Sequence, residues 1–214
     1  MTEQQTEEEE IWNPKTKLGK MVAREQITGI VEALDHDREI MEPEIVDQLV
    51  DLDEEVVLIG GTPGKGGGKS RTVSKRTVRM HKSGARYNSK AMSILGDRNN
   101  VIGIGMGESD DTRAAIEDAS RNAKLNLIKV QRGNGSWEDT ESTDNSIPFK
   151  VTGKSGSVEV ELKPAPKGTG LAAGEAIIED IWASTRGTTR TRENVVKAAF
   201  KAMKKLNEYK RSRE

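Results

Sequence analysis

The sequence predicts an α+β fold with two small domains: a layer of three strands and one helix, then a second α/β sandwich, after an extended N-terminal segment. Only 33% of the 214 residues are hydrophobic and 3% aromatic, which favours two small cores over one large core. Three strand-like runs precede an amphipathic helical pattern, an order typical of an α+β layer. Further strand and helix patterns follow a polar linker.

Residues 1–61 are predicted to form an acidic tail and an extension with short helices. The first ten residues are acidic and polar, as in disordered tails. Apolar residues at helical spacing predict short helices at 26–34 and 43–50, and Pro43 suits the first turn of the second helix. A short strand is expected at 56–59.

Residues 62–132 are predicted to form the first domain. Six glycines, one proline and two lysines indicate a flexible loop at 60–70. Strands are expected at 72–80, 87–95 and 101–106. N-cap candidates at 109–112 would begin a helix that runs to about Lys129. The buried face of that helix is predicted to comprise Ala115, Ile116, Ala119, Ala123 and Leu127.

The rest of the chain is divided into a linker at 133–146, a C-terminal domain at 147–209 and a basic tail at 210–214. The pattern in the domain predicts strands at 147–151 and 157–162, a short helix at 171–181, a loop at 184–190 and a helix at about 191–209. The last helix would bury Val195, Val196, Ala199, Met203 and Leu206, and would carry lysines on its outer face.

Charge is distributed very unevenly along the chain, although the net charge is only −1. Residues 1–61 hold five Lys/Arg and 17 Asp/Glu, whereas residues 62–96 hold nine Lys/Arg and no acid. A single charge run is often only a solvated surface, but 35 residues without an acid in a chain that is 32% charged indicate a surface for a polyanion.

Several classes of function lack support in the sequence. The chain has no cysteine, and its two histidines, His36 and His81, lie in polar segments, so neither a thiolate nor a zinc site is expected. The N-terminus does not resemble a signal peptide, and no apolar run reaches the roughly 18–20 residues that span a bilayer. We therefore expect a cytoplasmic protein without membrane contact, catalytic residues, metal or cofactor.

Two glycine-rich segments resemble nucleotide-binding motifs but depart from them. Before Gly68-Lys69-Ser70, Pro63 stands where the phosphate-binding loop needs its first glycine, and a strand is expected afterwards instead of a helix. In Gly103-x-Gly105-x-Gly107 the next required glycine is replaced by Glu108. The latter glycines suit close packing of a helix on a strand, or a bulge.

The strongest functional signal is a basic hairpin between the first two strands of the layer. Its candidate RNA-binding residues are Lys75, Arg76, Arg79, Lys82, Ser83, Gly84, Arg86 and Lys90. Cations suit phosphates, and a glycine at the tip lets backbone N–H groups approach RNA. Tyr87 is the one aromatic nearby, which favours folded RNA over single strands stacked on aromatic rings. The order of strands and helix also suits a layer of the double-stranded-RNA-binding type.

Several long segments, taken together, resemble the small-subunit ribosomal protein five family in its archaeal and eukaryotic branch, over roughly residues 11–208. The segments are Trp12-x-Pro14-x-Thr16-x-Leu18-Gly19, Glu42-Pro43-Glu44-Ile45-Val46-Asp47, the run from Ala123 to Val130, Arg132-Gly133-x-Gly135-Ser136-Trp137-Glu138, the run from Ile147 to Lys154, Pro164-Ala165-Pro166-x-Gly168-Thr169-Gly170-Leu171 and Thr189-Arg190-Thr191-Arg192.

The resemblance implies a structural constituent of the small ribosomal subunit that binds ribosomal RNA. It also implies contact with neighbouring ribosomal proteins near the messenger entrance, contact with messenger RNA there, and a part in decoding accuracy. In the family the tip between the first two strands touches ribosomal RNA, which here corresponds to Lys82, Ser83, Gly84 and Arg86. The alternative function is a free-standing double-stranded-RNA-binding protein or RNA chaperone.

Three segments depart from the family pattern. The loop at 60–70 looks inserted or extended, so no role is transferred to it. Asn134 and Asp139 stand near positions where relatives often carry cysteines, and the stretch at 174–182 looks shorter than usual.

Overall fold

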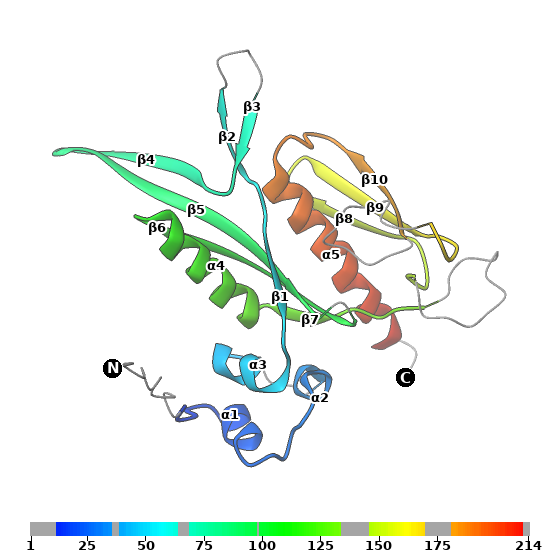
Figure 1. Ribbon diagram of the computed structural model, residues 1–214. Helices are drawn as coiled ribbons and strands as arrows, with labels where there is room; N and C mark the ends of the chain where they lie inside the picture. Colours follow the sequence, from blue (N-terminus) through cyan, green and yellow to red (C-terminus); the bar gives the residue numbers. More distant parts are fainter. Residues whose placement is uncertain are drawn as a thin grey trace, which may run out of the picture.

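The computed structural model describes residues 12–35, 39–63, 69–97, 99–133, 146–169 and 181–211 (Figure 1). Its helices are α1 (Lys17–Val22), α2 (Ile30–Asp35), α3 (Pro43–Leu49), α4 (Thr112–Leu125) and α5 (Arg192–Arg211). Its strands are β1 (Asp53–Val56), β2 (Gly60–Pro63), β3 (Lys69–Thr72), β4 (Lys75–His81), β5 (Gly84–Gly96), β6 (Val101–Ser109), β7 (Leu127–Lys129), β8 (Val151–Ser155), β9 (Val158–Pro164) and β10 (Ile181–Arg186). The fold is thus mixed α+β.

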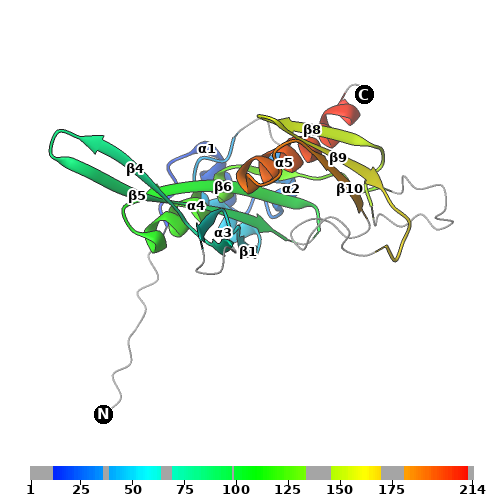
Figure 2. The same ribbon diagram turned by 90° about the horizontal axis from the view of Figure 1, so that it is seen from above.

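A five-stranded antiparallel sheet forms the centre of the molecule. Its order is β1-β5-β6-β7, and β4 pairs with the first half of β5 on the same side as β1. A second sheet has the order β10-β9-β8, and β2 and β3 form a separate hairpin. In both Figure 1 and Figure 2, α4 and α5 lie on opposite sides of β5 and β6.

Glycines on β6 let the backbone of α4 come unusually close to the central sheet. A Cβ atom at Gly105 would lie 2.0 Å from the carbonyl oxygen of Ala119, and one at Gly107 would lie 2.1 Å from that of Ala115. Ala115 and Ala119 are fully buried at this contact. The structure therefore confirms that these glycines serve close packing of helix on strand.

Helix α5 covers the opposite face of the central sheet and connects the two halves of the chain. Its Phe200 packs with Met92 of β5 and Ile104 of β6 in one buried cluster. The other side of α5 packs on β8, where a Cβ atom at Gly153 would lie 2.0 Å from the carbonyl oxygen of Ala198. One helix thus fills the space between the two sheets.

The N-terminal helices form a third cluster at the end of the central sheet, where Ile45 and Val46 pack with Val101 and Leu127. Glu42 fixes the segment before α1: it accepts hydrogen bonds from the backbone N–H groups of Lys15 and Thr16 and from the indole of Trp12. Partial burial alone would raise the pKa of Glu42, but these hydrogen bonds together lower it.

Some predicted boundaries in the first half are wrong because distant segments pair. β1 begins at Asp53 and ends at Val56, three residues earlier than expected. The ends of the predicted loop at 60–70 pair with each other as β2 and β3, while residues 64–68 lie outside the described part. β4 begins only at Lys75, after a bend.

The predicted helix after residue 112 ends four residues too late. α4 stops at Leu125, and Asn126 leaves the helical conformation with φ −116° and ψ 43°. Leu127–Lys129 then pairs with β6 as β7, so Leu127 is buried by a strand and not by a helix face. Asp111 is the N-cap, but its side chain makes no capping hydrogen bond. The helix α1 was not predicted, and α2 starts at Ile30 instead of residue 26.

In the second half the strands are displaced and one is gained. β8 begins where the predicted strand at 147–151 ends, and Pro148, ahead of it, packs against Gly133. Residues 184–186 are not loop but pair with β9. The predicted linker at 133–146 and helix at 171–181 fall almost wholly outside the described residues. None of the helices in the described part has the length and apolar character to cross a membrane.

The close packing of β6 on α4 predicts a large effect of one methyl group. In Gly105→Ala, the new Cβ would overlap backbone atoms of Ala119 and Ala123, so sheet and helix must separate. We expect the free energy of unfolding to fall by about 2–3 kcal/mol. The control is Gly61→Ala in β2, whose Cβ would lie 3.6 Å from the carbonyl oxygen of Ser70 and should change stability by less than about 0.5 kcal/mol. Equal denaturant midpoints for both variants would contradict the packing account.

Candidate nucleic-acid interface

The β4–β5 hairpin extends beyond the helices that cover the central sheet, as Figure 2 shows at its left edge. The two strands pair antiparallel from Lys75↔Lys90 to His81↔Gly84. Lys82 and Ser83 form the turn, and Gly84 adopts φ +118°. A Cβ atom at Gly84 would meet nothing within 4 Å, so this glycine is needed for its backbone conformation and leaves the tip open.

Cations oppose each other across one face of the hairpin. Side chains alternate between faces along a strand, so the register puts Lys75 and Lys90, and then Arg79 and Arg86, side by side on the face that α5 covers further along. Like charges directly opposite each other destabilise a strand pair. The arrangement is therefore one that a bound polyanion would stabilise.

Two glutamates neutralise the base of this face but not its outer part. Lys75 Nζ lies 3.4 Å from Glu193 Oε1 of α5, and Lys90 Nζ lies 3.0 Å from Glu108 Oε2 of β6. The hydrogen bond from Lys90 is the main cause that lowers the pKa of Glu108, and the charge of Arg79 adds to it. Among the described residues, Arg79 and Arg86 have no carboxylate within ion-pair distance.

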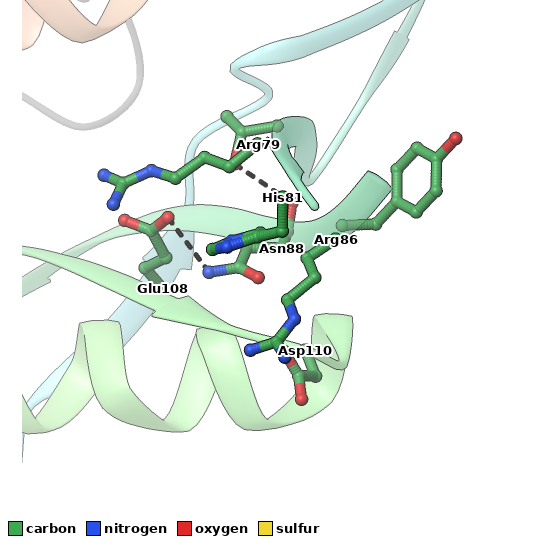
Figure 3. Close-up of a pocket in the computed structure, with 8 residues that line it drawn as sticks. Arg79, His81, Arg86, Asn88, Glu108 and Asp110 are labelled. Carbon is green, nitrogen blue, oxygen red and sulfur yellow. Dashed lines mark hydrogen bonds between the residues drawn. The ribbon is translucent and has the colours of Figure 1, made fainter. Parts of the chain in front are cut away.

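The same face holds an open hollow of about 570 Å³ near the end of β6 (Figure 3). Its lining comprises Thr77, Arg79, His81, Arg86, Tyr87, Asn88, Glu108 and Asp110. Asn88 donates a hydrogen bond to Glu108, and in Figure 3 the side chain of Arg79 extends towards Glu108 and that of Arg86 towards Asp110. Within the described ranges, no group of three or more His, Asp or Glu side chains could hold a metal ion.

The opposite face of the hairpin is apolar and exposed. Val78 and Met80 are 54% and 79% exposed, and Tyr87 lies directly opposite Val78. The guanidinium carbon of Arg76 lies 4.2 Å above the centre of the Tyr87 ring, a cation–π contact. Arg76 therefore belongs to a different face from the other strand cations.

The predicted site residues thus divide into three groups. Lys75, Arg79, Arg86 and Lys90 share one face, Arg76 lies on the other, and Lys82, Ser83 and Gly84 form the tip. The sequence analysis did not identify Glu108 and Glu193 as the ion-pair partners of Lys90 and Lys75. For Glu108 the alternation of strands could have signalled the pairing with Lys90, but Glu193 lies 118 residues from Lys75 and gave no such signal.

The nucleotide-binding motifs do not gain structural support. β3 follows the glycine loop in the chain, so the motif does not lead directly into a helix as a phosphate-binding loop does. His81 ends β4 beside the tip and is exposed, and His36 lies outside the described residues.

Comparison with known proteins agrees along most of the chain. The family model described as ribosomal protein S5, N-terminal domain, matches residues 63–131, and that described as ribosomal protein S5, C-terminal domain, matches residues 153–214. The chain is 43% identical over 205 residues to the small ribosomal subunit protein uS5 of Methanocaldococcus jannaschii, which covers 92% of this chain and 88% of that protein.

Two further relatives have similar coverage. The uS5 protein of Hyperthermus butylicus is 41% identical over 210 residues, which cover 94% of this chain and 92% of that protein. The uS5 protein of Nanoarchaeum equitans is 44% identical over 209 residues, which cover 92% and 89% respectively.

The exposure of the tip predicts that its charges affect binding and not folding. In Lys82→Glu with Arg86→Glu, stability should stay within about 0.5 kcal/mol of the wild type, because both side chains are exposed and the new carboxylate at position 86 would face Arg79. Affinity for ribosomal RNA should fall. Lys201→Glu with Lys204→Glu, exposed on α5, removes the same charge elsewhere and is the control. Thermal melting and RNA titration of both variants distinguish a role in binding from a role in folding. A tip variant that is destabilised but binds RNA with wild-type affinity would show that the tip has a structural role instead.

Proposed function

Because this chain belongs to the ribosomal protein S5 family, we propose that it is a structural constituent of the small ribosomal subunit, holds ribosomal RNA with the β4–β5 hairpin, and acts in the cytoplasm as part of the ribosome. Its relatives bear the names of ribosomal proteins and not of enzymes, and we assign it no catalytic role. The domain division at 62–132 and 147–209 stays a prediction.

The observation that carries the RNA-binding proposal is the pair of opposed arginines near the tip. Arg79 and Arg86 face each other, and among the described residues neither has a carboxylate within ion-pair distance, although Glu108 feels the charge of Arg79. A phosphate between two guanidinium groups would replace their repulsion by charge-assisted hydrogen bonds. Lys82 and the open backbone at Gly84 extend the same cationic surface to the tip.

Folded RNA is the form of ribosomal RNA that this surface suits best. β4, β5, β6 and α4 follow one another in the order of a double-stranded-RNA-binding layer. The exposed face of the hairpin offers one aromatic ring, and Arg76 already lies over it. Contacts to phosphates and 2′-hydroxyl groups therefore supply more of the recognition than base stacking does.

The family resemblance extends the proposal to the surroundings of the protein in the subunit. We place the hairpin near the messenger entrance, with neighbouring ribosomal proteins and messenger RNA as further contacts and with an effect on decoding accuracy. The exposed apolar side chains Val78 and Met80 support a closely packed environment for the hairpin, because large apolar side chains seldom gather at a projecting tip in water.

A free-standing double-stranded-RNA-binding protein or RNA chaperone would use the same hairpin. It would not need a chain that matches ribosomal relatives over more than nine-tenths of its length. The structural role therefore ranks first.

The two functions differ in stoichiometry and in salt dependence. As a subunit constituent, the tagged protein should sediment with small subunits at one copy each and remain after a salt wash that strips transient binders. Its affinity for isolated ribosomal RNA should fall linearly on a log–log plot against salt, by roughly 0.7–0.9 per phosphate neutralised. Substoichiometric recovery, with the protein mainly in the free fraction, would favour the chaperone. An affinity that does not change with salt would contradict the phosphate-driven interface.

A further inference from the structure

A second cationic surface lies between β10 and α5, apart from the hairpin. From Trp182 to Arg192 the chain contains three arginines, Arg186, Arg190 and Arg192, and no acid. All residues from 182 to 190 are exposed, and Arg192 is exposed as well. Hydroxyl side chains fill most of the positions between the arginines. Exposed guanidinium groups interleaved with hydroxyls form a surface rich in donors for phosphate oxygens.

Among the residues that the structure describes, these arginines form no ion pair. Glu159 is the cross-strand neighbour of Arg186, yet no ion pair joins them. Across the ranges that the structure describes, neither Arg190 nor Arg192 has a carboxylate within ion-pair distance. The neighbouring Glu193 is already engaged with Lys75.

The loop that carries the arginines is fixed by its backbone. Gly187 adopts φ +99°, and a Cβ atom there would lie 1.9 Å from the carbonyl oxygen of Ser157 in the β8–β9 turn. The N–H of Thr189 donates to the carbonyl of Gly187, and the N–H of Thr191 donates to that of Thr188. Little conformational entropy is therefore lost when this loop meets a ligand.

The loop lies on the same side of the central sheet as the cationic face of the hairpin. Glu193, next to Arg192, is bonded to Lys75 at the base of β4. Val196, one turn further along α5, packs on the cluster that contains Met92, whose side chain shares a face of β5 with Lys90. The cations of the hairpin and the three arginines of the loop thus lie on either side of the Lys75–Glu193 ion pair. Within that pair the two charges neutralise each other.

We propose that Arg186, Arg190 and Arg192 form a second contact with ribosomal RNA, which binds phosphates of a helix next to the one held by the hairpin. The proposal rests on the proposed ribosomal function. Arginine binds phosphate in a planar, bidentate manner, which suits a fixed loop better than flexible lysines do. Two cationic surfaces joined through α5 clamp two RNA segments in a set orientation, a property that neither surface has alone.

The test uses the full-length chain and small-subunit ribosomal RNA of Methanocaldococcus jannaschii transcribed in vitro. One variant carries Arg186→Gln, Arg190→Gln and Arg192→Gln. The control carries Lys197→Gln, Lys201→Gln and Lys204→Gln, which removes the same charge from the outer face of α5. A third variant, Lys82→Gln with Arg86→Gln, tests the hairpin separately. Affinity is measured over a series of KCl concentrations with transfer RNA as competitor, and thermal melting checks the fold of each variant.

We expect the arginine variant to lower the salt slope by roughly 2–3, at about 0.7–0.9 for each of three contacts, while the control keeps the wild-type slope. Equal losses in the arginine variant and the control would show a general charge effect and overturn the inference. A wild-type slope in the arginine variant, with a reduced slope in the hairpin variant, would overturn it but leave the proposed function intact.

Two further outcomes would also contradict the inference. If the arginine variant binds free ribosomal RNA normally but fails to enter assembled subunits, the arginines face a protein neighbour and not RNA. If the wild type shows no preference for ribosomal over transfer RNA, the inference and the proposed function fail together.

Discussion

The contact between the glycine face of β6 and the alanine face of α4 determines how the rest of the structure is arranged. Gly103, Gly105 and Gly107 recur at the two-residue period of one strand face, and Ala115, Ala119 and Ala123 recur at the four-residue period of one helix face. Because neither surface carries a side chain larger than a methyl group, the two backbones come into direct contact. Such a contact resists sliding, since every displacement brings a methyl group against a backbone atom.

A rigid sheet is what allows a two-stranded hairpin to carry charges away from the body of the protein. An isolated hairpin is only marginally stable in water, but β5 continues from the buried sheet into the hairpin without interruption. The opposed cations of the hairpin weaken it further, so its order depends on the anchored half of β5, where Met92 and Ser93 are fully buried. Helix α5 packs on the face of the central sheet opposite α4. It brings the C-terminal half, with its arginines, to the side of the sheet that carries the cationic face of the hairpin.

The sequence predicted those features that depend on local pattern. The glycines of β6 could be assigned to close helix packing, and the alanines of α4 to the buried face of that helix, because each set follows the period of its own element. The hairpin could be placed because Lys82, Ser83 and Gly84 form a turn between two alternating runs.

Features that depend on distant pairing could not be predicted in this way. Leu127–Lys129 continued the helical pattern of α4, and only β6 makes it a strand. Val78 and Met80 lie in the strand predicted at 72–80, but their exposure depends on the hairpin extending past the helices. The pairing of Lys75 with Glu193, and with it the neighbourhood of the two cationic surfaces, needs the tertiary fold.

The central claim is that the projecting hairpin lies against ribosomal RNA. The chain has no cysteine, so one cysteine can be introduced at Ser83 and loaded with tethered iron–EDTA. In reconstituted small subunits, hydroxyl radicals from this position should cleave one compact region of the ribosomal RNA. A tether at Glu55, exposed on acidic β1, should cleave that region weakly or not at all. Cleavage from Glu55 as strong as from Ser83, or none from Ser83, would contradict the account.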